Sequence, residues 1–93
     1  MDKYVSKVPS IAITINIDND GYKRFEVLRK NTNIGHIQMF HNWDTKPGYW
    51  DVHSWGREGY KGKVNELYSD TVGNKSIQEM LDVALAYFEH HVP

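Results

Sequence analysis

Isoleucine occupies every second position from residue 11 to residue 17, and smaller or polar residues fill the positions between. Successive side chains of a β-strand point to opposite sides, so this strict alternation predicts a half-buried strand over residues 10–18. Such a strand is stable only when it pairs with other strands and its apolar side lies on another layer. The start of the chain therefore requires a sheet with a buried face.

Three further strands are expected after this one, and residues that favour turns separate each from the next. Asn and Asp tolerate positive φ, and Pro and Gly interrupt a strand, so these residues mark the reversals of the chain. Leu28 breaks the alternation of the second strand, which indicates a β-bulge or an outward-facing apolar residue. The expected strands cover residues 22–30, 34–41 and 49–55, with turns at 18–21 and 31–33 and a loop at 42–48.

The segment between the fourth strand and the end of the chain is less regular. Residues 56–63 contain three glycines and four charged side chains, which is typical of a solvated loop. Residues 64–68 are expected to form either a short fifth strand or an extended edge. The sheet is therefore predicted to contain four or five strands.

A C-terminal helix is predicted over residues 77–91. Ser76 followed three residues later by Glu79 is a capping box, in which each side chain accepts a hydrogen bond from a backbone N–H at the helix start. The apolar residues of this segment form one stripe, which must lie on one face of the sheet. The predicted fold is α+β, an antiparallel four- to five-stranded meander sheet with one C-terminal helix packed on one face. The stripe contains Ile77, Met80, Leu81, Ala84, Leu85, Phe88 and Val92.

Size and composition restrict the class of protein. Residues 1–93 are expected to form a single compact domain, in which only the first seven residues look loose. The absence of cysteine excludes a disulfide scaffold, a thiolate zinc site and a cysteine nucleophile. No apolar segment is long enough to span a bilayer, and the N-terminus lacks the apolar core of a signal peptide. A cytoplasmic protein without membrane contact is therefore expected.

One helix covers only one face of a sheet, so the second face meets solvent or a partner. In the fourth strand we choose Trp50 and Val52 as the inward residues, because the other phase would bury Asp51 and His53 without partners. The predicted inner set is Ile11, Ile13, Ile15, Ile17, Phe25, Val27, Ile37, Met39, Trp50 and Val52. The predicted outer set is Tyr22, Arg24, Leu28, His36, Gln38, Phe40, Tyr49, Asp51, His53 and Trp55.

The outer set is rich in aromatic, histidine and arginine side chains rather than in Thr, Lys, Glu and Ser. Such side chains bury large areas at a small cost in rotamer freedom and are common in the energetically dominant part of protein interfaces. The outer face and its neighbouring loops are therefore the expected binding surface for a larger protein. The residues expected to bind are Arg24, His36, Phe40, Trp43, Tyr49, His53, Trp55, Arg57 and Tyr60.

Other interpretations of these residues stay open. The rings could form a minor core beneath the loops at 42–48 or 56–63, or two copies could bury the face in a homodimer. The net charge of −1 predicts neither nucleic acid nor a membrane as partner. Residues 21–63 nevertheless carry eight basic and four acidic side chains, whereas residues 64–93 carry one lysine and five acids. A basic, aromatic sheet face could therefore bind nucleic acid by stacking bases.

No motif in the sequence identifies a reaction. His36, His53 and Asp51 share the predicted outer face, and two imidazoles beside a carboxylate can act as acid and base on a phosphodiester. A small histidine-dependent nuclease is therefore a further alternative. His90 and His91 point about 100° apart on the predicted helix, so they suit the negative end of the helix dipole rather than a shared metal ion. No catalytic residue, metal or cofactor is expected.

A short chain without cysteine, linker or cofactor motif, and with an aromatic surface of mixed charge, favours a non-enzymatic binding protein. An inhibitor or blocker of a larger protein fits this size, in the style of phage-encoded proteins that block host defence enzymes or of immunity proteins for toxins. Nucleic-acid binding through the same face is the main alternative, and a steep dependence of affinity on salt would identify it.

Overall fold

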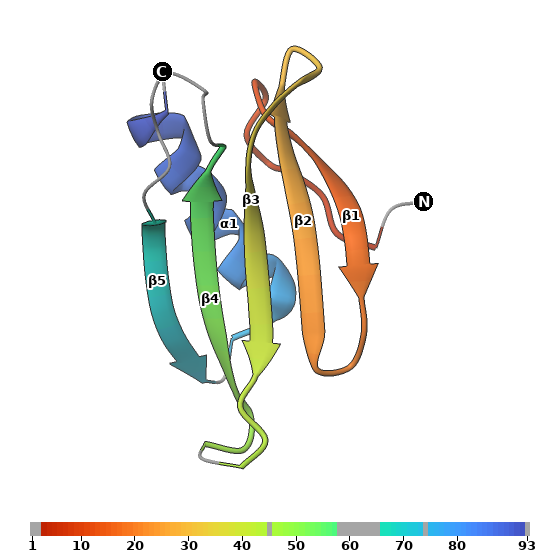
Figure 1. Cartoon of the computed structure of the whole chain (residues 1–93), viewed down its shortest axis with the longest axis vertical. Helices are drawn as coiled ribbons and strands as arrows, with labels where there is room; N and C mark the ends of the chain where they lie inside the picture. The colour runs from red at the N-terminus through yellow and green to blue at the C-terminus, as the bar shows by residue number, and fades with distance from the viewer. Residues whose placement is uncertain (1–2, 45, 58–65, 74, 93) are drawn as a thin grey trace.

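The computed structural model describes residues 3–44, 46–57, 66–73 and 75–92, and of residues 66–68 the backbone only. In this part of the chain five strands form one antiparallel sheet, and one helix lies against a single face of it (Figure 1). The elements are β1 (Ala12–Asp18), β2 (Tyr22–Arg29), β3 (Thr32–His41), β4 (Tyr49–Gly56), β5 (Glu66–Gly73) and α1 (Ile77–His91). The strands lie side by side in chain order, so the predicted α+β meander with a C-terminal helix is confirmed.

The apolar layer between the sheet and α1 is the core. Phe25 lies opposite Ile37, and Met39 lies opposite Val52, so antiparallel pairing brings their side chains into the core together. Trp50 is partly buried and packs on this layer, which confirms the predicted inward phase of β4. The inward position predicted for Ile17 is wrong, because a register shift after Ile15 pairs Ile17 with Arg24 of the opposite face. The fully enclosed apolar side chains are Phe25, Val27, Ile34, Ile37, Met39, Val52, Leu81, Ala84, Leu85 and Phe88.

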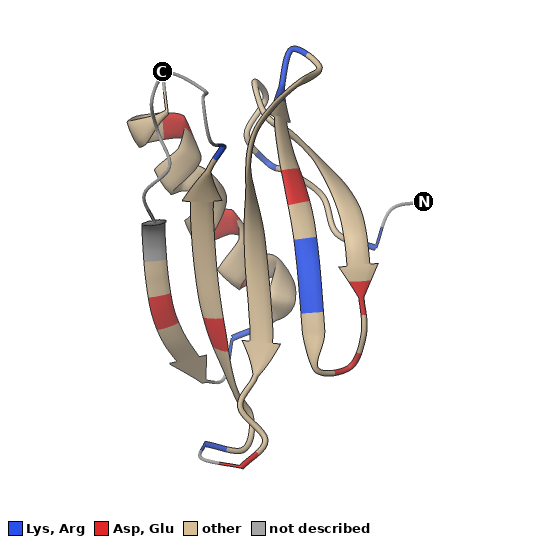
Figure 2. Cartoon of the chain, viewed as in Figure 1, with Lys and Arg blue, Asp and Glu red and all other residues tan. Residues whose placement is uncertain are grey.

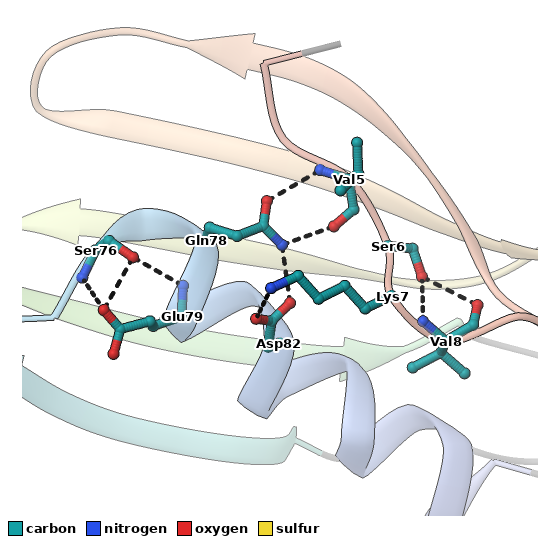
Figure 3. Close-up of polar contacts among 8 residues, drawn as sticks. All are labelled: Val5, Ser6, Lys7, Val8, Ser76, Gln78, Glu79 and Asp82. Carbon is teal, nitrogen blue, oxygen red and sulfur yellow. Dashed lines mark hydrogen bonds and ion pairs between the residues drawn. The ribbon is translucent and has the colours of Figure 1, made fainter.

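Both ends of α1 have capped backbone groups. Ser76 Oγ accepts a hydrogen bond from the Glu79 N–H at 3.1 Å, and the Glu79 carboxylate accepts one from the Ser76 N–H at 3.3 Å (Figure 3). The predicted capping box is therefore confirmed. At the other end, the Arg29 guanidinium donates to the Val92 carbonyl at 2.6 Å, where a cation also suits the negative end of the helix dipole. This contact ties the end of α1 to the end of β2.

The N-terminal segment lies along the start of α1 (Figure 3). The Val5 N–H donates to Gln78 Oε1 at 3.0 Å, and Gln78 Nε2 donates back to the Val5 carbonyl at 2.7 Å. Lys7 pairs with Asp82 at 3.4 Å, and Tyr4 packs against the core. The sequence predicts a loose segment here, whereas its described part is held by groups 73 positions away that no local pattern reveals.

The fifth strand extends further toward the C-terminus than predicted. It covers Glu66–Gly73 rather than residues 64–68, of which 64 and 65 lie outside the described residues. Its pairing with β4 continues as far as the pair formed by Tyr49 and Gly73. Pairing with β4 thus continues β5 through Asp70 and Gly73, whose residue types are depleted in strands.

The turn between β2 and β3 is one residue earlier than predicted. Lys30 and Asn31 have φ values of 51° and 63°, which fit a two-residue hairpin turn whose twist matches that of the strands. Thr32 already belongs to β3. The irregularity predicted at Leu28 is confirmed as a register shift between Val27 and Leu28 in the pairing of β2 with β3.

Candidate functional site

The face of the sheet opposite α1 is covered by no helix or strand of the described chain, and it points toward the viewer in Figure 1. Every second side chain of β2, β3 and β4 lies on this side. Antiparallel pairing aligns these side chains in rows, for example Glu26, His36 and Trp55. We call this surface the outer face and define it by Tyr22, Arg24, Glu26, His36, Gln38, Phe40, Tyr49, Asp51, His53 and Trp55.

Phe40 is the centre of a group of rings on the outer face. Its ring centroid lies 4.8 Å from that of Tyr22 on β2 and 6.4 Å from that of His53 on β4. Phe40 nevertheless stays 40% exposed and Tyr49 stays 38% exposed, whereas Trp55 is partly buried. Within the described chain these rings therefore do not close into a minor core of their own.

The β4 side chains of the outer face contact hydroxyl groups on β5. Asp51 Oδ1 accepts a hydrogen bond from the Thr71 hydroxyl at 2.8 Å, and His53 Nδ1 lies 3.3 Å from the Ser69 hydroxyl. His36 lies on the neighbouring strand β3. The three groups considered for a nuclease thus share one face, and two of them are held by the edge strand.

Arg24 and Glu26 form an ion pair on the β2 side of the outer face. Arg24 Nε donates to Glu26 Oε2 at 2.7 Å, and the same carboxylate accepts hydrogen bonds from Asn16 at 3.2 Å and Asn33 at 3.0 Å. Partial burial opposes the charged form, but these hydrogen bonds outweigh it and hold the pKa of Glu26 below its ordinary value of 4.5. Sequence reasoning missed Glu26 as a site residue, although residues i and i+2 of a regular strand share a face.

A hollow of about 500 Å³ opens on the outer face beside this ion pair. Gly35 and Gly56 lie opposite each other on β3 and β4 and contribute only backbone to its lining. Burial and the nearby charge of Arg24 lower the pKa of His36 below its ordinary value of 6.5, so this imidazole is neutral at neutral pH. The side chains around the hollow are those of Arg24, Glu26, Asn33, His36, Trp55 and Arg57.

The expected binding residues are divided between several places. Trp43 was expected beside the outer face, but its ring packs on that of His41, with the centroids 3.8 Å apart and the planes tilted by 50°, and stays 61% exposed. His41 pairs with the inward residue Trp50, so Trp43 lies at the end of the inner layer. Arg57 borders the hollow, and Tyr60 lies outside the described residues. Six expected residues lie on the outer face itself, namely Arg24, His36, Phe40, Tyr49, His53 and Trp55.

All Lys and Arg residues of the described strands belong to β2 (Figure 2). Lys23 is buried on the helix side, and Arg29 is turned toward the end of α1. Arg24 is paired with Glu26, and Asp51 adds a further negative charge. β3, in the middle of the face, contains no Lys, Arg, Asp or Glu. The described outer face is therefore close to neutral, whereas Lys61 and Lys63, which contribute to the expected basic charge, lie outside the described residues.

No protein-family model, curated protein or solved structure matches this chain. Among the described residues, no three His, Asp or Glu side chains gather closely enough to hold a metal ion. The helix of the described chain falls short of the length and apolar character that crossing a bilayer demands. The geometry and chemistry of the outer face are what indicate a function.

Proposed function

We propose that this protein is a small, non-enzymatic binding module that docks its outer face onto a larger protein and thereby blocks or inhibits it. The observation that carries the proposal is the exposure of the Phe40 and Tyr49 rings on a face that no described element covers. Truncating such a ring in a protein complex typically costs much binding free energy, because the ring buries a large area with little loss of rotamer freedom.

The shape of the molecule supports a protein as the partner. The chain measures 37 × 31 × 19 Å along its principal axes, and the view down the shortest axis shows the sheet face-on (Figure 1). The outer face is therefore the broadest side, and a specific interface needs roughly 800 Å² from each partner. Occupying a patch of that size on a larger protein excludes other molecules from the patch, which is how a small domain blocks it.

The charges favour a protein over a nucleic acid. Binding to a phosphate backbone depends on several lysine or arginine side chains that neutralise phosphates. On the outer face Arg24 is already paired with Glu26, and the middle strand β3 has no formal charge. A nearly neutral face with exposed rings is better matched to the apolar centre of a protein interface.

A matched pair of variants tests the proposal by capture of the partner from cells that make this protein. Tyr49 on the outer face and Tyr87 on α1 are 38% and 37% exposed, so alanine at either position removes the same ring from opposite sides. Tyr49→Ala should weaken binding of the captured, purified protein on the order of thirtyfold. Tyr87→Ala should leave the affinity unchanged, and both variants should melt within a few degrees of the wild type.

Several outcomes of this experiment would contradict the proposal. Equal loss of affinity in Tyr49→Ala and Tyr87→Ala would show that the outer face is not the contact. Capture of nucleic acid, with an affinity that falls steeply between about 50 and 200 mM salt, would favour the alternative partner. Self-association of the pure protein through Tyr49, measured by light scattering, would indicate a homodimer. Turnover of RNA or DNA by the wild type would show that the protein is an enzyme.

A further inference from the structure

The hollow on the outer face combines cationic groups with aromatic walls. Arg24 and Arg57 border it, together with the rings of His36 and Trp55. Its volume of about 500 Å³ lies within the range of roughly 300 to 1,000 Å³ that is common for ligand sites. A concave site of this size with a few convergent polar groups can enclose a side chain of a partner.

The formal charges of the described side chains that line the hollow leave an excess of one positive charge. Arg24 and Arg57 are cationic, Glu26 is anionic, and His36 is neutral at neutral pH. Both oxygens of Glu26 already accept hydrogen bonds, so this carboxylate is occupied within the fold. Among the described residues, the Arg57 guanidinium makes one long hydrogen bond, 3.4 Å from Nη1 to the Asn33 carbonyl, and pairs with no carboxylate. The Arg57 backbone N–H donates to the Ile34 carbonyl at 3.0 Å.

We propose that this hollow receives one carboxylate side chain, Asp or Glu, of the protein partner. The inference rests on the proposed function, since the partner presents the carboxylate when the outer face docks. A guanidinium group binds a planar carboxylate with short, charge-assisted hydrogen bonds, and Arg57 lies exposed at the rim for this purpose. Trp55 offers an apolar wall for the methylene groups of the same side chain.

The charge balance favours a carboxylate over a phosphate as the occupant. One carboxylate cancels the single excess positive charge, whereas a phosphate monoester carries about 1.5 to 2 negative charges at neutral pH. The second charge of a phosphate would lie near the ionised Glu26 without a further cation among the described side chains that line the hollow. A partner residue of the Asp or Glu type is therefore the best electrostatic complement.

Titration with small probes tests the site without the partner. Benzoate and benzamide have the same shape and differ in charge, and inorganic phosphate represents the other anion. In ¹H–¹⁵N NMR spectra, benzoate should shift the amide signals of Gly35 and Gly56 and the indole signal of Trp55. Saturation is expected at millimolar concentrations, as for other fragments of this size. Benzamide should bind at least about tenfold more weakly, because it lacks the charge.

Variants assign the binding to the two arginines. Arg57→Gln should weaken benzoate binding by about tenfold, because a charge-assisted hydrogen bond is lost at an exposed position that the fold does not need. Arg24→Gln should weaken it similarly, and Arg57→Gln keeps the test valid if Arg24→Gln does not fold. Lys46→Gln is the control, since it removes the same charge from an exposed residue outside the hollow and should have no effect.

The carboxylate assignment is supported if benzoate binds saturably, benzamide does not, and only the arginine variants lose affinity. It is wrong if benzoate gives no saturable shifts, if benzamide binds equally well, or if phosphate binds more tightly. These results would contradict only the assignment of a carboxylate to the hollow, not the proposed docking of the outer face. The docking proposal fails separately, when Tyr49→Ala and Tyr87→Ala bind the captured protein equally well.

Discussion

The two faces of the sheet use the same strands in opposite ways. On the helix side Phe25, Ile37 and Met39 are fully buried, whereas Phe40, the next residue after Met39, stays 40% exposed on the outer face. One step along a strand therefore separates a side chain that stabilises the fold from one that is available to a partner. Stability and recognition are thus encoded at alternate positions of the same segments.

Lys23 and Arg24 show the same division for charged groups. Lys23 is buried on the helix side, where Nζ donates to Asp18 Oδ1 at 2.6 Å and to the Asn19 carbonyl at 3.0 Å. These contacts close the β1–β2 hairpin. Arg24 instead holds Glu26 on the outer face and borders the hollow. The inner cation is fully occupied within the fold, whereas the outer one adjoins an open space.

The largest effect on stability is expected on the helix side. Leu81→Ala removes a fully buried side chain and leaves a cavity, so the free energy of unfolding should fall by about 2 to 5 kcal/mol. Val83→Ala changes an exposed residue of the same helix and should alter the free energy of unfolding by less than about 0.5 kcal/mol. Denaturant unfolding measures both, and similar losses would contradict the division of α1 into a buried and an exposed side.

A smaller loss of stability is expected at acidic pH, where the contact between Asp18 and Lys23 is weakened. The hydrogen bond from Lys23 holds the pKa of Asp18 below its ordinary value of 3.8, although burial opposes this. Because the folded-state pKa is the lower one, the stabilisation is complete above the unfolded-state pKa and is lost as the pH falls through the folded-state pKa. Asp18→Asn should therefore be less stable than the wild type at pH 7, and this difference should shrink below about pH 3.8.

Unfolding free energies measured from pH 7 to pH 2 check this prediction. Asp20→Asn, an exposed carboxylate of the same turn, is the control and should follow the wild type at every pH. A stability difference between Asp18→Asn and the wild type that stays constant over the whole range would show that the contact with Lys23 does not depend on the charge of Asp18.

The smallest effect on stability is expected on the outer face. Phe40→Ala loses ring contacts with Tyr22 and His53 but opens no cavity in the core, so the loss should be about 1 kcal/mol or less. The melting temperature should stay within a few degrees, while the affinity for the partner falls. If Phe40→Ala unfolds the protein, the outer face belongs to the core, and the contrast between the two faces disappears.

Local patterns were sufficient to predict most of the fold. The alternating isoleucines of β1 and the Ser76–Glu79 capping box depend on residues only two or three positions apart, so their structural consequence is visible in the sequence. The fifth strand is different, because Ser69, Asp70 and Thr71 show no apolar alternation. These residues are extended because they pair with β4, and pairing partners are distant in the chain.

The candidate site was predictable to the same extent. The two-residue period of a strand predicts the side of the sheet on which Phe40, Tyr49 and Trp55 lie. By the same rule, Glu26 could have been included among the predicted site residues. The orientation of Trp43 could not be predicted, because it depends on the contact of this loop residue with the His41 ring.

The sequence by itself determined which residues of β2, β3 and β4 face the helix and which face away, where the helix begins, and that large rings lie on the uncovered side. In β1 the register shift after Ile15 reversed the predicted side of Ile17. Periodicity and capping act over a few residues and need no knowledge of the rest of the chain. Only the tertiary structure decided the length of β5, the attachment of the N-terminal segment to α1, and the hollow between Arg24 and Arg57. Each of these arises where segments far apart in the chain meet, and the strand pairing and packing that bring them together have no local signature.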